Sequence, residues 1–314
     1  YLPLAVWLPI LAIRHRGAFV WTAANPGISH GGGVVGESKA SILSLLDHPR
    51  LLPWVEIPAG PPASERARDA ASRMTFGFPA IVKPDSGQRG FAVRRVSSVE
   101  DLERYLTTMT NAALVQKYHP GPDEVGIMWI RGVGIFSITK KVLPVLEGDG
   151  RHTIEALLFR DRRRLVQAHV FLERLGARAF ERPSGAVALG DAANHVQGAR
   201  FHDGAELVEM FAPLIDEVMR DRDSLDIGRF DVRYRTIDDA GIIEFNGTTS
   251  ESTNIYDAEK HVIWAWGVLL RHWSHLYRLG AERRAQGVQP MTARTVWRTW
   301  RTFKAARTGS SRSS

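Results

Sequence analysis

The chain has 314 residues, of which 44% are hydrophobic and 24% charged, as is ordinary for one large or two smaller globular domains. It contains no cysteine, which excludes a disulfide scaffold and cysteine-based zinc sites and fits a reducing compartment. The net charge of +7 comes largely from the segment after Gly280, where Lys and Arg far outnumber the one acid, Glu282. The basicity therefore describes a tail, and we expect no nucleic-acid-binding fold.

The first 13 residues, YLPLAVWLPILAI, are uncharged and are followed by RHR. The run is too short to span a bilayer, and it lacks the basic start and the cleavage site of a signal peptide. Pro3 and Pro9 argue against one regular helix. Two readings stay open: a buried element of the core, or a segment that contacts a membrane surface.

In the first half of the chain, short strands alternate with helices. The expected elements are a Gly-rich loop at 18–36, a helix at 37–52, a polar helix within 58–74, a strand at 78–84, a loop at 85–90, a strand at 91–96, a helix at 97–106 and a strand at 113–119. Ser98, with Asp101 three residues later, is the expected N-cap of the helix at 97–106.

The second half continues the same mixture. We expect a turn at 121–124, strands at 125–132 and 134–143, a helix within 148–161, a helix at 205–220, a hairpin at 226–246 and an aromatic-rich helix at 261–280. Because strict βαβ order is missing, the predicted fold class is α+β with largely antiparallel sheets.

The hairpin at 226–246 has one charged face and one apolar face, because residues two apart in a strand share a face. In its first strand the charged face carries Arg229, Asp231, Arg233 and Arg235, opposite Phe230, Val232 and Tyr234. In its second strand Glu244 and Asn246 share one face, and Ile243 and Phe245 share the other. A turn is expected at 238–241.

This arrangement brings Asp231, Glu244 and Asn246 together without any His or Cys nearby in sequence. All-oxygen ligands suit Mg²⁺ or Mn²⁺ better than zinc. The alternative is a surface salt-bridge ladder between the carboxylates and the arginines.

A second polar stretch, FPAIVKPDSGQRGFAV, places Lys83 at a strand end before a loop with Ser86, Gly87 and Gly90. Glycines let backbone N–H groups approach phosphate oxygens, and a lysine adds a positive charge. The stretch matches neither a Walker A nor a Rossmann signature, so an ordinary hairpin turn remains the alternative.

Taken in order, FPAIVKPDSGQRGF, VQKYHPGPDE, GRFDV and IIEFNGTTS resemble the ATP-grasp superfamily, in particular carboxylate–amine ligases like D-alanine–D-alanine ligase. The resemblance covers roughly residues 36 to 257. It implies an ATP-grasp fold, in which two α+β subdomains clamp ATP, here with a truncated N-terminal segment. The implied domains are a partial pre-ATP-grasp region at 1–73, the ATP-grasp domain at 74–280 and a basic tail at 281–314.

The resemblance also implies roles for the matched residues. The implied nucleotide contacts are Lys39, Lys83, Ser86, Gly87, Gly90, Gln116, Lys117, Tyr118 and Glu124. The implied Mg²⁺ (or Mn²⁺) ligands are Asp231, Glu244 and Asn246, and the implied catalytic cations are Arg229 and Arg151. Asn194 is a further candidate for a substrate or phosphate contact.

The implied activity is an ATP- and Mg²⁺-dependent ligase that joins a carboxylate to an amine through an acyl phosphate and releases ADP and phosphate. Its substrates would be small molecules or peptides, and related ligases are often homodimers. Two alternatives stay open: a kinase-like phosphotransferase, and a nucleotide-binding, membrane-associated module without turnover. We expect a cytoplasmic protein.

Residues 292–307 of the tail place Val296, Trp297, Trp300 and Phe303 on one side, with Arg and Lys around the rest. Such a basic amphipathic helix either lies on an anionic membrane surface or docks on its own domain. Together with residues 1–13, it is the candidate for peripheral contact with the inner face of a membrane.

Overall fold

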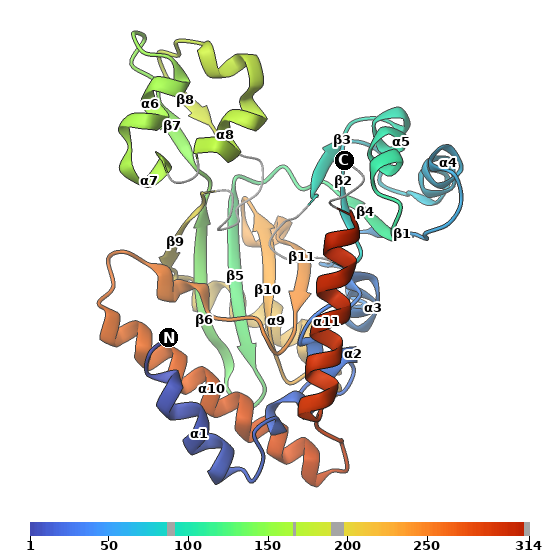
Figure 1. Cartoon of the computed structure of the whole chain (residues 1–314), viewed down its shortest axis with the longest axis vertical. Coiled ribbons are helices and arrows are strands. Elements are labelled where there is room, and N and C mark those ends of the chain that lie inside the picture. Colours follow the sequence, from blue (N-terminus) through green and yellow to red (C-terminus); the bar gives the residue numbers. More distant parts are fainter. Residues whose placement is uncertain (87–91, 166–167, 190–197, 311–314) are drawn as a thin grey trace.

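The computed structural model describes the chain except residues 87–91, 166–167, 190–197 and 311–314 (Figure 1). The strands are β1 (Trp54–Ile57), β2 (Ala80–Pro84), β3 (Arg94–Val96), β4 (Ala113–Lys117), β5 (Asp123–Ile130), β6 (Gly134–Val142), β7 (Val145–Glu147), β8 (Ala186–Ala188), β9 (Arg200–Asp203), β10 (Ile227–Tyr234) and β11 (Gly241–Asn246). The α-helices are α1 (Leu4–Arg14), α2 (Ser29–Gly33), α3 (Lys39–Leu46), α4 (Ala63–Arg73), α5 (Val99–Thr108), α6 (Ile154–Arg160), α7 (Arg162–Leu165), α8 (Ala168–Leu175), α9 (Val208–Met219), α10 (Val262–Ala285) and α11 (Ala293–Ser310). Short 3₁₀ helices are η1 (Val20–Ala23), η2 (Gly176–Phe180), η4 (Ala205–Leu207), η5 (Ile237–Asp239) and η6 (Thr253–Tyr256).

The described strands form three sheets, and every named pair of strands is antiparallel. The largest sheet has the order β11–β10–β5–β6–β9, the second β1–β4–β2–β3, and the third pairs β7 with β8. The predicted α+β class with antiparallel sheets is therefore confirmed.

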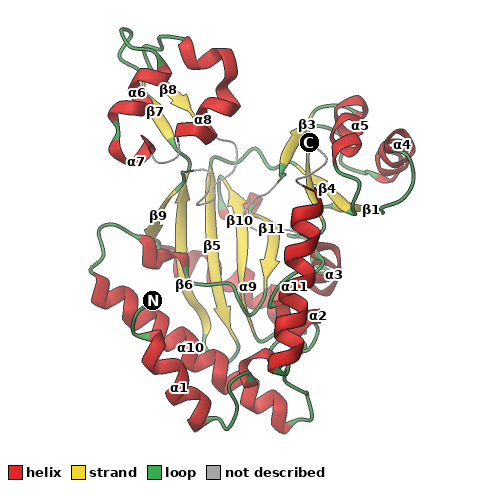
Figure 2. Ribbon diagram, viewed as in Figure 1, coloured by secondary structure: helices red, strands yellow, loops and turns green. Residues whose placement is uncertain are grey.

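Each sheet has its own apolar core. Figure 2 shows the strands of the three sheets in yellow and the helices in red. Alternation along β5 and β10 turns Ile127, Phe230 and Val232 to one face of the large sheet, where they pack with Phe211 of α9 and Leu43 of α3. The four-stranded sheet packs on α4 and α5, and β7 and β8 pack on α6 and α8.

The opposite face of the large sheet is divided between apolar and polar ends. At one end Met128 and Ile130 of β5 form an apolar cluster with Leu276 and Leu279 of α10. The other end is not part of that cluster and carries the charged residues described in the next section. Alternation along one strand thus supplies both a core and a polar surface.

The N-terminal run forms the single helix α1, so the inference from Pro3 and Pro9 is wrong. Pro3 occupies the N-cap, where the helix requires no N–H donor. Pro9 lies on the exposed side of the helix, and packing of Leu11 and Trp7 against α10 holds the helix together. One side of α1 is buried against α10, and contact of its exposed side with a membrane surface stays a prediction. Within the described part of the chain, no helix has the length and apolarity that a bilayer-crossing segment requires.

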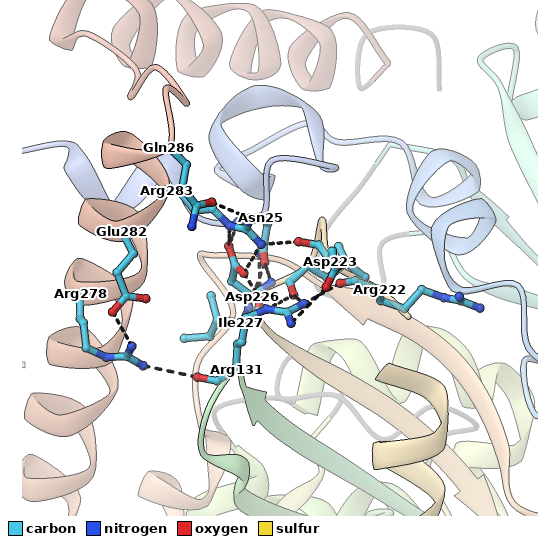
Figure 3. Close-up of polar contacts among 11 residues, drawn as sticks. Asn25, Arg131, Arg222, Asp223, Asp226, Ile227, Arg278, Glu282, Arg283 and Gln286 are labelled. Atoms are coloured by element: carbon cyan, nitrogen blue, oxygen red, sulfur yellow. Dashed lines mark hydrogen bonds and ion pairs between the residues drawn. The ribbon is translucent and has the colours of Figure 1, made fainter. Parts of the chain in front are cut away.

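A polar network around Asp226 joins four parts of the chain (Figure 3). The Asp226 carboxylate is buried and accepts hydrogen bonds from Arg131 at the end of β5 and from Arg283 of α10. The Asn25 side chain donates to the carbonyl of Ile227 and accepts from the backbone N–H of Asp226. The network fastens the N-terminal segment and α10 to the start of β10.

Several element boundaries follow local chemistry. The Ser98 hydroxyl accepts from the N–H of Asp101, which confirms the predicted N-cap of α5. The helix expected over 37–52 ends at Leu46, because Asp47 has a positive φ of 27°. The strand expected over 91–96 is shorter, since β3 spans Arg94–Val96 and Ala92 has a φ of 53°.

Candidate active site

The polar end of the large sheet is centred on Lys141 of β6. Its Nζ lies 3.0 Å from Oε1 of Glu124 on β5 and 2.9 Å from Oδ1 of Asp231 on β10. Arg229 of β10 adds a second cation, with its Nε 3.1 Å from the same Asp231 oxygen. Arg233 lies on the far side of Glu124, with its Nε 3.4 Å from Oε2. Three strands therefore contribute one cluster of alternating charge.

Gly126 makes this cluster possible. Strand register places Asp231 opposite Gly126 and Lys141 opposite Glu124, so Lys141 reaches Asp231 by crossing the surface of β5 beside Gly126. A Cβ at position 126 would lie 3.3 Å from Cε of Lys141 and 3.2 Å from Cδ of Arg229. A larger residue would therefore crowd both cations.

The charges in the cluster hold one another ionised. Burial raises the pKa of Asp231, but Lys141 and Arg229 outweigh burial and hold that pKa at about 2. Burial lowers the pKa of Lys141 and of Arg229, and here the nearby carboxylates outweigh it, so both pKa values are raised. Lys141, Arg229 and Asp231 are therefore held in their charged forms within a largely buried cluster, rather than in an exposed ladder of surface pairs.

Next to the cluster, β11 contains a bulge at Ile243. Asp231 pairs with Glu244, but Val232 pairs with Ile242, so Ile243 has no partner on β10. The prediction that Ile243 shares the apolar face with Phe245 is therefore wrong, and Ile242 occupies the core instead. The bulge turns the Ile243 carbonyl toward the second sheet, where it accepts from Gln116 at 3.1 Å and from Lys83 at 3.4 Å.

Lys83 of β2 is buried where the two larger sheets meet. Its Nζ donates to Oε1 of Gln116 at 3.0 Å and lies 3.9 Å from Oε2 of Glu244. Burial lowers the pKa of Lys83, and Glu244 opposes that shift. Gln116 also donates to the carbonyl of Leu52. Its hydrogen bonds therefore connect β4 with β2 and β11.

Lys39 is brought to the same region by Asp85, a residue that the sequence did not suggest. The Asp85 carboxylate accepts from the N–H of Ala40 and from the hydroxyl of Ser38 at the start of α3. The Asp85 carbonyl accepts from the N–H of Lys39, so the end of β2 is fastened to the first turn of α3. Lys39 is thereby close enough to contribute to the lowered pKa of Lys83.

Glu244 and Asn246 lie half-buried on β11, beside Asp231. Nδ2 of Asn246 donates to Oε1 of Glu244 at 3.1 Å. Nearby on β6, Thr139 is buried and its hydroxyl has no hydrogen-bond partner among the described residues. A bound ligand or water would complete such a group, because buried polar atoms are rarely left unpaired.

The other predicted residues make their contacts outside the cluster. The N–H of Lys117 donates to the carbonyl of Pro53, and the ring of Tyr118 lies under Arg95, with 4.5 Å between guanidinium carbon and ring centroid. Ser86 is exposed in the loop after β2. Arg151 is exposed in the lobe of β7 and β8, and its N–H donates to Asp149. The predicted residues Gly87, Gly90 and Asn194 lie outside the described residues.

Within the described ranges, no group of three or more His, Cys, Asp or Glu residues is arranged to hold a metal ion. The predicted set has two carboxylates and one amide, so it is not a group of that kind. Asp231, Glu244 and Asn246 still supply only oxygen donors from two adjacent strands, which is the chemistry that Mg²⁺ requires.

Sequence reasoning missed Lys141, which is the centre of the cluster. A partial signal was present, because Ser137, Thr139 and Lys141 are spaced two residues apart in the strand predicted at 134–143, although Lys140 interrupts the apolar side of the pattern. Only the order of the strands, with β5 between β6 and β10, shows that Lys141 shares a face with Asp231.

No protein-family model and no curated protein matches this sequence. Among solved structures, the chain is similar to a bifunctional glutathione synthetase from Pasteurella multocida, with 16% identity, 75% of this chain and 36% of that chain covered, and a TM-score of 0.42. It is also similar to the D-cycloserine synthetase DcsG, with 16% identity, 77% and 70% coverage and a TM-score of 0.46. A third similar structure is D-alanine–D-alanine ligase from Bacillus anthracis, with 16% identity, 79% and 67% coverage and a TM-score of 0.44.

All three are ATP-grasp enzymes, and the similarity at this identity concerns the fold. The chain spans about a third of the glutathione synthetase and about two thirds of each of the other two.

Proposed function

We propose that this chain is an ATP- and Mg²⁺-dependent ligase that joins a carboxylate to an amine through an acyl phosphate. The observation that carries the proposal is the buried cluster of Lys141, Arg229, Asp231 and Glu124 beside Lys83 and Glu244. Burying so many charges carries a large desolvation cost. The cluster suits a reaction in which charge moves between two anions.

The positions of the cations support a role in phosphoryl transfer. Lys83 and Lys39 come from two elements joined by Asp85, and we assign them to the phosphates of ATP. Arg229 would neutralise charge that develops on the transferred phosphoryl group, because its planar guanidinium can bind two oxygens at once. Glu124 would accept hydrogen bonds from the ribose, and Gln116, Lys117 and Tyr118 would border the adenine.

The remaining residues complete the proposed site. Ser86, Gly87 and Gly90 would cover the phosphates and exclude water, which protects an acyl phosphate from hydrolysis. Arg151 would contact the carboxylate substrate or its phosphate. Asp231, Glu244 and Asn246 would hold Mg²⁺, which would supply charge neutralisation at the phosphate oxygens. Because the proposed reaction consumes ATP, which the cytoplasm supplies, we propose a cytoplasmic location.

The test is ADP release by the purified chain with Mg²⁺ and ATP, screened against mixtures of carboxylates and amines. Asp231→Asn and Glu244→Gln should each lower ADP release by about 100-fold or more, since both remove charge at the reacting phosphates. The matched control is Asp238→Asn, which removes the same charge from an exposed position in the same hairpin and should leave the rate unchanged. Full turnover in Asp231→Asn would refute the metal assignment.

The product distinguishes the proposal from its alternatives. A ligase releases ADP only when both the carboxylate and the amine are present. A stable phosphorylated product without an amine would identify a kinase-like phosphotransferase. Tight ATP binding with no ADP release in any mixture would identify a nucleotide-binding module.

A further inference from the structure

The outward face of α1 is apolar along its whole length. Leu2, Val6, Ile10 and Ile13 are 82%, 67%, 44% and 79% exposed. Their spacing places them on one side of the helix, and Ala5 and Pro9, which are also exposed, add no polar group. The solvent-facing side of a helix in a globular protein is ordinarily polar. An exposed apolar face of this kind marks a surface that contacts another protein or a membrane.

The face is held in place by the rest of the molecule. Leu4 and Leu11 are buried on the opposite side of α1, and Leu11 belongs to one apolar cluster with Tyr277 of α10. The indole N–H of Trp7 donates to the hydroxyl of Ser274 at 3.0 Å. Arg284 of α10 donates to the carbonyls of His15 and Arg16 and so fixes the chain just after α1. The apolar face is therefore presented outward by a docked helix.

The charge at the C-terminal end of this face is positive, whereas at its start the Tyr1 hydroxyl donates to the carboxylate of Glu251. The sequence has no acidic residue before Glu37, whereas Arg14 and Arg16 are exposed at the end of α1. In α10, against which α1 packs, Glu282 is the one acid. An apolar face bordered by arginines is complementary to a bilayer surface that contains anionic lipid.

The size of the face does not suit a stable dimer. An 11-residue helix is about 16 Å long and about 10 Å wide. The area of its outward face is therefore far smaller than the ~800 Å² that each partner buries in a typical protein–protein interface. A lipid surface has no such minimum, since single amphipathic helices bind membranes.

We propose that α1 is a peripheral membrane anchor, which inserts Leu2, Val6, Ile10 and Ile13 into the headgroup region of an anionic bilayer while Arg14 and Arg16 contact the lipid phosphates. Figure 1 shows α1 on the outside of α10, at the opposite end of the molecule from the lobe of β7 and β8. Anchoring through α1 leaves the polar end of the large sheet open to small substrates. The anchor does not depend on ligase activity.

The test is cosedimentation of the full chain with vesicles of phosphatidylcholine, with or without about one third phosphatidylglycerol. Binding should need the anionic lipid and should fall as salt rises, because salt screens the arginines. Val6→Glu combined with Ile10→Glu should lower vesicle binding about 10-fold or more, and Arg14→Gln combined with Arg16→Gln should remove most of the preference for anionic lipid. The matched control is Phe159→Glu with Met210→Glu, which adds the same charges to exposed apolar positions of α6 and α9.

Circular dichroism verifies that each variant is folded. Retained binding in the folded α1 variant, or no binding of the wild-type chain to anionic vesicles, overturns the proposal. So does binding that is lost only in Trp297→Glu with Trp300→Glu, since that result assigns the contact to α11. Light scattering tests whether the molar mass doubles as the protein concentration rises. If it doubles, if the α1 substitutions abolish the doubling, and if the wild-type chain binds no vesicles, then a second copy covers the face.

Discussion

At the scale of single residues, Lys141 decides whether the candidate site is stable. Its ammonium group is buried between two carboxylates, and Gly126 leaves room for it to cross β5. Its sequence neighbour Lys140 points to the other face and pairs with Glu206 near the surface, at 2.5 Å. Two adjacent lysines therefore have different energetic roles because strand alternation separates them.

This difference gives a direct stability prediction. Lys141→Met should lower the free energy of unfolding by about 3–5 kcal/mol, because it leaves Asp231 and Glu124 buried without their shared partner. Lys140→Met is the matched control and should change it by less than about 1 kcal/mol, the usual worth of an exposed pair. Urea unfolding of the two variants and the wild type measures both values, and equal losses would contradict a special role for Lys141.

At the scale of elements, the sequence predicts what depends on regular periodicity and local capping. Strands β5, β6 and β10 and helix α5 with its Ser98 cap are found close to their predicted positions. The bulge at Ile243 was not predictable, because it depends on how β11 pairs with β10 and not on the residues of β11 alone. The helix α1 was missed because tertiary packing on α10 outweighs the cost of an internal proline.

The same limit applies to the site. Asp231, Glu244 and Lys83 could be singled out because polar residues in a strand are visible in the sequence. Lys141 and Asp85 could not be placed, since their partners come from elements that are distant in the chain. Sequence periodicity identifies which residues of a strand share a face. The order of the strands in the sheet determines which residues of different strands lie side by side on that face.

Helix α10 contains a buried group that should respond to pH. His272 is buried against Phe136 and Trp273, and Nδ1 has no hydrogen-bond partner within the described part of the chain. Burial, assisted by nearby His275, lowers the pKa of His272 from 6.5 to about 4. Between pH 6.5 and about pH 4, the His272 imidazole is therefore mainly neutral in the folded state and mainly protonated in the unfolded chain.

The sign of the pH effect follows from that shift. The neutral imidazole costs no stability above pH 6.5, whereas below it the unfolded state binds a proton that the native state does not. The free energy of unfolding should therefore fall by about 1.4 kcal/mol per pH unit, to a total of about 3 kcal/mol near pH 4. His272→Phe should remove this part of the pH dependence, while the exposed His169→Phe should keep it. Parallel unfolding curves for wild type and His272→Phe from pH 7 to 4 would rule the mechanism out.

At the scale of the whole molecule, the large sheet is held between the N-terminal segment and α10, and the Asp226 network is where the three meet. Asn25 precedes α2, Arg131 directly follows β5, and Arg283 lies in the last turns of α10 (Figure 3). The same end of the molecule carries α1, which packs on α10. The placement of α1, and with it the proposed membrane anchor, therefore depends on how firmly α10 is attached to the sheet.

Removing the buried carboxylate tests that attachment. Asp226→Ala should lower the free energy of unfolding by about 3 kcal/mol or more, because it leaves Arg131 and Arg283 without their common partner. Asp223→Ala is the matched control: its side chain is 97% exposed and lies 3.7 Å from Arg131, so its loss should cost less than about 1 kcal/mol. Chemical denaturation measures both variants, and hydrogen exchange should show faster opening of α10 in Asp226→Ala alone. A loss no larger than that of the control would mean that apolar packing, rather than this network, holds α10 in place.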